Sequence, residues 1–343
     1  MARNATIRDV AARAGVSIAT VSRVLNGGAP STSDTSERVR AAIADLGFRP
    51  NRIGRSLKAA RTRTIGVLVP SLRNPVFADS VAGLEDAAAA AGYSVLIASS
   101  DYDSERERRA VDTLLSHQVE GLVLTVADAD GSAALDALES AGAPYILVYN
   151  QPHASGRPFV SVDNVAAARG LVGRMTELGH RRIGMVAGRF GQSDRSRLRR
   201  DGFLTALDAA GLEPGPVIEV DFADTRLAQH LAPHMMPGTR PTALFCSNDM
   251  VALAVIRALS DLGLSVPGDV SVTGFDGIEV GALVSPSLAT LIQPARAMGE
   301  HAFARLLANL NEGEPAGPLI LPFTIRPGES LGAAPTEAQT QRG

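Results

Sequence analysis

From residue 65 onward, short apolar runs alternate with amphipathic stretches of helical length, and this alternation leaves few architectures open. We predict a first series of strands at residues 65–70, 93–99, 121–125 and 144–150, separated by helices at 76–91, 104–117 and 131–141. A second series predicts strands at 159–163, 182–188, 217–220, 242–247 and 270–276, with helices at 164–179, 194–210, 224–236 and 248–262. Continuously apolar strands between helices are typical of parallel sheets that are covered on both faces. The sequence therefore predicts an α/β body of two doubly wound units in tandem.

Polar side chains stand at the ends of three of these strands, at Asn150, Asn248 and Asp276. Ligands of open parallel sheets bind at the carboxyl ends of the strands, so two facing units predict a binding cleft between them. A carboxylate, an amide and a guanidinium together suit a ligand with adjacent hydroxyls, because they donate and accept paired hydrogen bonds. A structural Asx turn at Asp276 and a helix cap at Asn248 are the alternatives.

Four arginines, at 195, 197, 199 and 200, fall within the predicted helix 194–210. They fit two interpretations. One is an anionic ligand such as a sugar acid or a sugar phosphate, and the other is a solvated helix face. We favour the solvated face for most of the four, and an exposed position is the alternative to a ligand contact for Arg199.

The charge of the chain is divided unevenly along its length. Residues 1–63 carry 12 Lys and Arg against four Asp and Glu, a net charge of +8, whereas the remainder carries 21 against 32, a net charge of −11. A basic segment in front of an acidic body is typical of a protein whose first part binds a polyanion. A solvated basic surface is the alternative that charge alone leaves open.

The basic segment has the spacing of a helix-turn-helix. At Ala11 the small side chain allows a close helix crossing, and Gly15 can adopt the positive φ of a tight turn. Two further apolar residues, Val21 and Val24, would pack the second helix onto the first. Ser17 is a candidate N-cap of that second helix. A third helix is expected from Thr32 or Ser33 to Gly47, which completes a small three-helix unit.

Several classes of protein are disfavoured. The single cysteine, Cys246, fits a reducing compartment and a small buried side chain, and residues 1–30 lack a signal sequence, so we expect a cytoplasmic protein without a membrane span. We find no nucleophile elbow, Walker loop, dinucleotide fingerprint or zinc-protease motif, so we predict neither an enzyme nor a cofactor. The spacing of His230 and His234 is only weak evidence for a zinc site, because no third ligand stands at a suitable spacing, and we favour a pair of surface histidines. A transport binding protein would have a signal sequence and lack the basic segment.

The run ATVSRVLNG (19–27) and the run ERVRAAIADLGFRPNRIGRSLKAARTRTIGVLVP (37–70) resemble the amino-terminal signature of the LacI/GalR family of bacterial transcription regulators. The resemblance extends over nearly the whole chain. It implies a helix-turn-helix headpiece at 1–49, a hinge at 50–63, an effector-binding and dimerisation core at 64–330 and a flexible tail at 331–343. The core would resemble periplasmic sugar-binding proteins, with subdomains at about 64–162 plus 292–323 and about 163–291 plus 324–330. Crossovers between the subdomains are expected near 161–164, 291–294 and 323–326.

The resemblance also implies which headpiece residues contact duplex DNA. The second helix would lie in the major groove, where Arg23 suits guanine and Ile18 and Ala19 offer apolar contact, for example to a thymine methyl. A core position is the alternative for Ile18, and Thr6 is equally a helix cap or a phosphate ligand. Side chains placed for phosphates are Ser17, Thr20, Ser22 and Asn26.

The hinge would become helical on DNA, where two hinges pair and insert a leucine into the minor groove. Leu57 and Lys58 occupy the matching positions, and we count Arg55 among the DNA contacts. Without the resemblance this stretch reads as a basic linker. Gly54 weakens a helix here by about 1 kcal/mol relative to Ala, which fits folding upon binding.

In the core, the resemblance assigns effector contacts to Asn74, Phe77, Arg199, Asn248 and Asp276. Asn150 is added as a sixth candidate because it ends the fourth predicted strand. The chain is thus expected to be a sequence-specific repressor that binds a near-palindromic operator as a homodimer. Its effector would be a sugar or sugar derivative, with a sugar acid, a sugar phosphate, a nucleobase or a corepressor as the alternatives. The tail lacks a leucine heptad, which favours a dimer over a tetramer.

Overall fold

The computed structural model describes residues 5–25, 33–48, 62–313 and 317–335. The chain forms two compact units, Met1–Thr62 and Arg63–Gly343, which we call the headpiece unit and the body. Residues 49–61, which hold nearly all of the predicted hinge, lie outside the described ranges. The hinge and its boundary with the headpiece therefore stay predictions.

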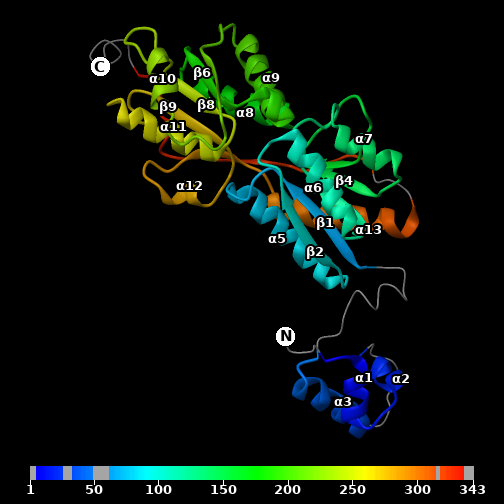
Figure 1. The fold of residues 1–343 in the computed structure, drawn as a ribbon. Coiled ribbons are helices and arrows are strands. Elements are labelled where there is room, and N and C mark those ends of the chain that lie inside the picture. The colour runs from blue at the N-terminus through cyan, green and yellow to red at the C-terminus, as the bar shows by residue number, and fades with distance from the viewer. Residues whose placement is uncertain (1–4, 26–32, 49–61, 314–316, 336–343) are drawn as a thin grey trace. The chain divides into compact units, whose positions relative to one another are not determined.

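The headpiece unit contains the three expected helices (Figure 1): α1 (Ile7–Ala14), α2 (Ile18–Leu25) and α3 (Ser33–Asp45). Gly15 ends α1 with a φ of +66°, a conformation that favours glycine. The buried core that joins the helices consists of Val10, Ala11, Ala14, Val21, Val39 and Ala42. Ala11 and Val21, which were predicted from their spacing to join the first two helices, thus lie in this core.

The first lobe of the body is built on a sheet of six described strands in the order β11-β5-β4-β3-β1-β2, with every neighbouring pair parallel. These strands are β1 (Thr64–Val69), β2 (Ser94–Ser99), β3 (Gly121–Leu124), β4 (Tyr145–Val148), β5 (Phe159–Ser161) and β11 (Leu319–Ile320). The helices of this lobe are α5 (Pro75–Ala90), α6 (Ser104–Ser116), α7 (Ala133–Ser140) and α13 (Ala295–Glu312).

The second lobe repeats this plan in the order β12-β10-β9-β8-β6-β7, and its β12 runs antiparallel to β10. Its strands are β6 (Ile183–Gly188), β7 (Val217–Val220), β8 (Ala243–Cys246), β9 (Ser271–Asp276), β10 (Ala289–Ile292) and β12 (Thr324–Arg326). Its helices are α8 (Asn164–Glu177), α9 (Asp194–Ala209), α10 (Ala228–Leu231), α11 (Asp249–Asp261) and α12 (Val280–Leu283), with short 3-10 helices at Phe190–Gln192 and Ala232–His234. The predicted α/β fold of two largely parallel sheets is confirmed.

The chain passes between the lobes at three places in the described body. It crosses between β5 and α8, between β10 and α13, and between β11 and β12. The strands of both lobes therefore end near one another at the junction. This arrangement brings residues that are far apart in the sequence to one cleft.

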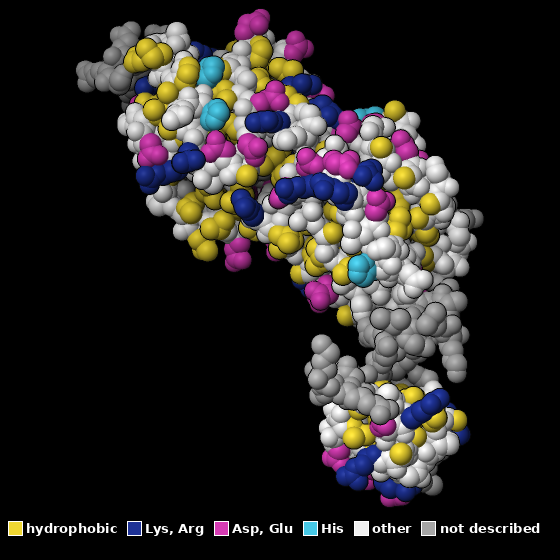
Figure 2. All heavy atoms as spheres, in the orientation of Figure 1, with side chains coloured by type: hydrophobic (Ala, Val, Ile, Leu, Met, Phe, Trp, Pro, Cys, Tyr) yellow, Lys and Arg dark blue, Asp and Glu magenta, His cyan; other side chains and the backbone are white. Residues whose placement is uncertain are grey.

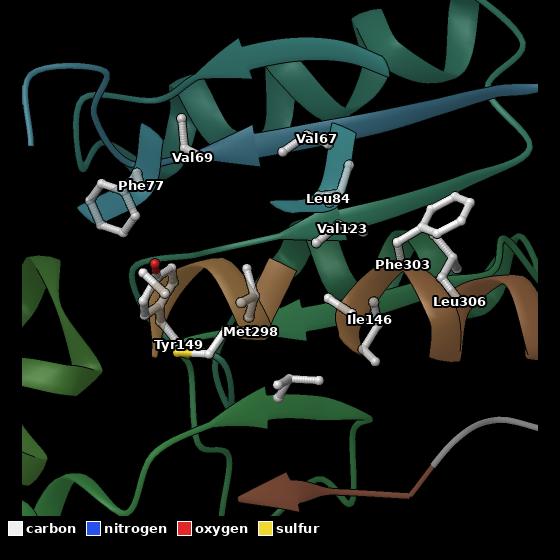
Figure 3. Packing of buried hydrophobic residues seen from close by; sticks show 14 of the residues in the cluster. Val67, Val69, Phe77, Leu84, Val123, Ile146, Tyr149, Met298, Phe303 and Leu306 are labelled. Carbon is white, nitrogen blue, oxygen red and sulfur yellow. The ribbon is translucent and has the colours of Figure 1, made fainter. Parts of the chain in front are cut away.

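Helices α5 and α13 pack against each other on one face of the first sheet. Figure 3 shows the side chains that fill this layer, among them Leu84 of α5 and Met298, Phe303 and Leu306 of α13. The two helices approach closely, since a Cβ at Gly299 would lie 1.8 Å from the backbone oxygen of Ser80. This close crossing fixes the start of α5, which carries two of the predicted cleft residues.

The predicted helix at 224–236 is wrong in extent. The structure has one helical turn at Ala228–Leu231 and a 3-10 turn at Ala232–His234. The Asp221 and Asp224 carboxylates accept hydrogen bonds from the backbone N–H groups of residues 223 and 226, which closes turns where the helix would start. Pro233 lacks the N–H that a continuing α-helix needs.

Candidate functional site

Helix α1 begins with a capping box at Thr6. The Thr6 hydroxyl accepts from the N–H of Asp9, and the Asp9 carboxylate accepts from the N–H and the hydroxyl of Thr6 at 2.7 Å. The cap interpretation of Thr6 is therefore confirmed. Its contact with a phosphate stays a prediction.

Helix α2 has one buried side and one exposed side. Ser17 caps its start by accepting from the N–H of Thr20 at 3.2 Å, and Val21 is fully buried. Ile18 is 45% exposed, and Ala19 and Arg23 are also exposed. The alternative that Ile18 is a core residue is wrong. An apolar side chain and a guanidinium thus lie on the outward side of the helix that is predicted to read bases.

The other predicted DNA contacts are only partly described. Thr20 and Ser22 are half-buried on α2, next to this outward side. Asn26, Arg55, Leu57 and Lys58 lie outside the described residues and stay predictions. Basic and acidic side chains are both visible on the drawn surfaces of the headpiece unit and of the body (Figure 2).

The second candidate site is a cavity of about 20 Å³ between the lobes of the body. Five of the six predicted effector contacts line it: Asn74, Phe77, Arg199, Asn248 and Asp276. Asn74 and Asn248 are the N-caps of α5 and α11, and Asp276 ends β9. Asn248 therefore caps a helix and also lines the cavity, and its contact with an effector stays a prediction.

The centre of the cavity wall is a buried ion pair. Arg199 is 5% exposed, and its Nη1 lies 3.5 Å from Oδ1 of Asp276. Its Nε donates to Asn164 at 2.9 Å and its Nη1 donates to the Ser247 carbonyl at 2.5 Å. Burial lowers the pKa of Arg199 to about 10. Arg199 is therefore buried, and the alternative that it occupies an exposed position is wrong.

The Asp276 carboxylate is oriented by both lobes. It accepts from Asn74 at 2.9 Å and from Gln293 at 2.8 Å, and its backbone has a φ of +116°. Burial raises the pKa of Asp276, while the nearby Arg199 opposes that rise. The turn that follows β9 is closed by Asp249, whose carboxylate accepts from the N–H groups of Gly277 and Ile278. The Asx-turn alternative for Asp276 is therefore wrong.

Two aromatic rings close one side of the cavity. Tyr102, which follows β2, stacks on Phe222, which follows β7, with ring centroids 4.4 Å apart and an angle of 22°. Phe222 also lies directly on Gly188, where a Cβ would be 1.9 Å from the ring. Beyond this pair, a hollow of about 390 Å³ shares Asn74, Tyr102, Phe222 and Asn248 with the inner cavity. The stacked rings thus line both the inner cavity and the outer hollow.

Asn150 does not line the cavity, which corrects its predicted role. It is fully buried, and its Nδ2 donates to Asp194 at 2.7 Å and to the Val126 carbonyl at 2.9 Å. Asp194 also accepts from the N–H of Ala129 at 3.1 Å and donates its own N–H to Ala127 at 2.7 Å. Asp194 begins α9 of the second lobe, so we call these contacts with Asn150, Ala127 and Ala129 of the first lobe the interlobe bridge.

Eight further lining residues were not among the six predicted effector contacts: Val76, Tyr102, Tyr149, Ser193, Arg195, Ser196, Phe222 and Gln293. Tyr102, Phe222 and Gln293 follow strands, so the rule that located Asp276 applies equally to them. Arg195 is 4% exposed, whereas Arg197 and Arg200 are half-buried. Two of the four arginines of α9 therefore lie inside the protein, where a solvated face was favoured.

The described residues give little support for a metal site, a reactive cysteine or a membrane span. Among the described residues no group of three or more His, Cys, Asp or Glu could hold a metal ion, and His230 pairs with Asp224 at 3.4 Å. Cys246 is fully buried, and burial raises the pKa of its thiol. None of the described helices is long and apolar enough to cross a membrane.

Comparisons with known proteins agree with this division. The family described as "Bacterial regulatory proteins, lacI family" matches residues 6–51, and "Periplasmic binding proteins and sugar binding domain of LacI family" matches residues 62–322. Catabolite control protein A of Priestia megaterium is 30% identical over 311 residues, covering 90% of this chain and 93% of that protein. The transcriptional repressor CytR of Escherichia coli K12 is 33% identical, covering 91% and 92%. A crystal structure of the lac repressor dimer, bound to operator and the anti-inducer ONPF, matches with a TM-score of 0.83 and 30% identity, covering 96% and 100%.

Proposed function

The chain belongs to the LacI family of bacterial regulatory proteins, and on that premise we propose how its two units act together. It is a DNA-binding transcriptional repressor that acts as a homodimer and responds to a small molecule. The headpiece units of two subunits bind a near-palindromic operator, because two-fold protein symmetry requires symmetric half-sites. The effector binds in the interlobe cavity of each body.

The observation that carries the DNA-binding proposal is the outward side of α2. Ile18 and Ala19 are exposed at the start of the helix and Arg23 is exposed one turn later, while Val21 anchors the opposite side in the core. An apolar side chain near a thymine methyl and a guanidinium near guanine O6 and N7 would read bases in the major groove. Ser17, Thr20, Ser22 and Asn26 would contact phosphates and fix the register.

The effector proposal rests on the cleft. The cavity combines two buried guanidinium groups, a carboxylate, three amides and an aromatic pair, which suits a small polar ligand with hydroxyl groups. Such a ligand changes operator binding only if it binds one arrangement of the lobes better than another. A coupling free energy of about 1–3 kcal/mol is typical of such control.

Three finer points are part of the proposal. The body binds its effector without converting it, since the relatives are repressors and the cleft is explained by binding alone. The hinge at 50–63, with Arg55, Leu57 and Lys58, transmits the change to DNA through the minor groove. The protein acts in the cytoplasm and associates with the nucleoid when it is bound to its operator.

Selection of operators from a pool of random duplexes tests the DNA-binding role. The full-length protein should enrich a sequence with two inverted half-sites. Binding of that sequence should exceed binding of a scrambled duplex by at least 1000-fold in physiological salt. Retention of every duplex with equal affinity, or of none, would contradict the proposal.

A further inference from the structure

Two residues in the described lining of the cavity, Arg195 and Gln293, each have a buried polar side-chain atom without a hydrogen-bond partner, and the first is the guanidinium of Arg195. Its Nη1 donates to the Val126 carbonyl at 2.7 Å and lies 3.1 Å from Oδ1 of Asp194. Its Nη2 is buried without a hydrogen-bond partner among the residues that the structure describes. Buried donors are almost always paired in folded proteins, so this nitrogen indicates a place for an acceptor oxygen.

The surroundings of Arg195 favour a negative oxygen over a neutral one. Ser193 and Ser196, at the start of the 16-residue helix α9, line the same cavity, so the positive end of the helix dipole faces it. The nearby Arg199 adds a second guanidinium whose charge is matched by Asp276. A charged acceptor forms a shorter and stronger hydrogen bond with a guanidinium than a neutral carbonyl does.

Two carboxyl groups limit how much negative charge a ligand can bring. Asp194 pairs with Arg195, and Glu107 accepts from the N–H of Ala127 in the same region. Burial raises the pKa of Glu107 to about 7. Neither group lines the cavity, but both interact with Arg195, so a dianion such as a phosphate monoester would meet more repulsion there than a monoanion.

Two other lining residues, Gln293 and Asp276, can accept hydrogen bonds from a ligand. Gln293 uses its Nε2 on Asp276, while its Oε1 is buried without a partner among the described residues. Asp276 contributes carboxylate oxygens beside it. Hydroxyl groups of a ligand would donate to both residues.

We propose that the effector is a sugar acid, that is, a polyhydroxylated monocarboxylate whose carboxylate binds Nη2 of Arg195 and whose hydroxyls bind Gln293 and Asp276. This inference rests on the proposed effector role of the cleft and specifies its chemistry. The inner cavity of about 20 Å³ is too small for such a ligand, so the Tyr102–Phe222 stack must move. The cavity then joins the outer hollow of about 390 Å³, which is within the size range of small-molecule sites.

The test compares acids with neutral partners of the same carbon skeleton. Gluconate with glucitol, glucuronate with glucose, and galacturonate with galactose are titrated into the full-length protein by calorimetry, alongside glucose 6-phosphate and adenosine. At least one acid should bind tenfold or more tightly than its neutral partner. A tightest ligand that is a neutral sugar, the phosphate or the nucleoside would overturn the inference.

Arg195→Met separates recognition of the carboxylate from recognition of the hydroxyls. It should weaken the acid at least thirtyfold and change the neutral partner less than threefold. Arg200→Met, on the same helix but outside the cavity lining, should change neither. An equal loss for acid and neutral partner in Arg195→Met would overturn the inference.

Arg195→Lys covers the case in which the methionine variant does not fold. It keeps the positive charge without the fork of the guanidinium, so the preference for the acid should fall but remain above threefold. An unchanged preference in this variant would contradict the role of Nη2. If no compound of any class binds or alters operator affinity, the effector part of the proposed function fails as well. A neutral effector that releases the operator would leave that function standing.

Discussion

The headpiece unit and the body both depend on arginine, but they hold it in opposite ways. Arg23 lies on the exposed side of α2, and its Nε donates a long hydrogen bond of 3.4 Å to the carbonyl of Ala19. Arg199 is 5% exposed, contacts Asn164, Ser247 and Asp276, and lies over the Phe275 ring at 3.6 Å. An exposed charge attracts a polyanion at a distance and is screened by salt, whereas a buried charge acts in a fixed geometry and is screened much less.

One residue type thus serves two kinds of recognition in this protein. In the headpiece unit the side chain is free to adapt to a DNA surface that it meets from solution. In the body it is ordered in advance, so that a ligand does not have to organise the site after it enters. Operator binding should therefore fall steeply with added salt, while ligand binding should change little.

Asp276→Ala is expected to give the largest effect and to be confined to the body. It removes the carboxylate that faces Arg199 and leaves a buried positive charge without its partner. Ligand affinity in calorimetry should fall at least a hundredfold, about 3 kcal/mol. Operator affinity, measured by fluorescence anisotropy without ligand, should stay within threefold. An equal loss of operator binding would break the separation between the two units.

Arg23→Ala should produce the complementary effect in the headpiece unit. Loss of a bidentate contact with guanine is expected to cost about 2 kcal/mol, roughly thirtyfold, for the selected operator and much less for a scrambled duplex. Arg23→Lys is the matched control, because it keeps the charge and loses the fork. Should both duplexes lose affinity equally in Arg23→Ala, the residue reads phosphates instead of bases.

Glu107→Gln tests how burial sets the pH response of the body. Burial raises the pKa of Glu107 from 4.5 to about 7, so the folded protein holds a proton that the unfolded chain releases. Its contribution to stability is therefore fully present below pH 4.5 and is lost as the pH rises towards 7. The free energy of unfolding of the wild type, relative to the glutamine variant, should drop by about 2 kcal/mol between pH 5 and 7.

Chemical denaturation at several pH values, followed for the body, measures this difference. The glutamine can still accept from the N–H of Ala127, so the local structure should be kept. Parallel pH profiles of the two proteins would show that Glu107 keeps its ordinary pKa.

Ile18→Ala is expected to give the smallest effect. The side chain is 45% exposed, so thermal stability should change little, while loss of apolar contact with DNA should cost about 1 kcal/mol of operator affinity. Val21→Ala, on the buried side of the same helix, should instead destabilise the headpiece unit by about 2 kcal/mol. A drop in melting temperature for Ile18→Ala similar to that for Val21→Ala would show that the two sides of α2 are not distinct.

Local sequence patterns predicted what depends on local physics. The spacing of Ala11, Gly15 and Val21 identified the headpiece core, and apolar strands with polar ends located Asn248 and Asp276 at the cleft. Prediction was wrong where turn chemistry overrode helix periodicity, as at Asp221 and Asp224.

Prediction was weakest where contacts cross between the lobes. Asn74 donates to Asp276, 202 residues away, and Asn150 donates to Asp194, 44 residues away. Neither pairing follows from periodicity, because each depends on how two separately folded sheets meet. The burial of Arg195 is of the same kind, since its Nη1 contacts a carbonyl of the other lobe.

Helix α9 both connects the two lobes through the interlobe bridge and lines the cavity, and this combination has a thermodynamic consequence. Asp194 joins the lobes one residue before Arg195 enters the cavity wall, and Arg197 pairs with Asp128 of the first lobe at 2.9 Å. A ligand that shifts the first turn of α9 therefore also strengthens or weakens the interlobe bridge. The affinity for the ligand and the free energy of separating the lobes are therefore coupled. Substitutions that weaken the interlobe bridge should increase the rate of ligand dissociation, although the substituted residues do not contact the ligand.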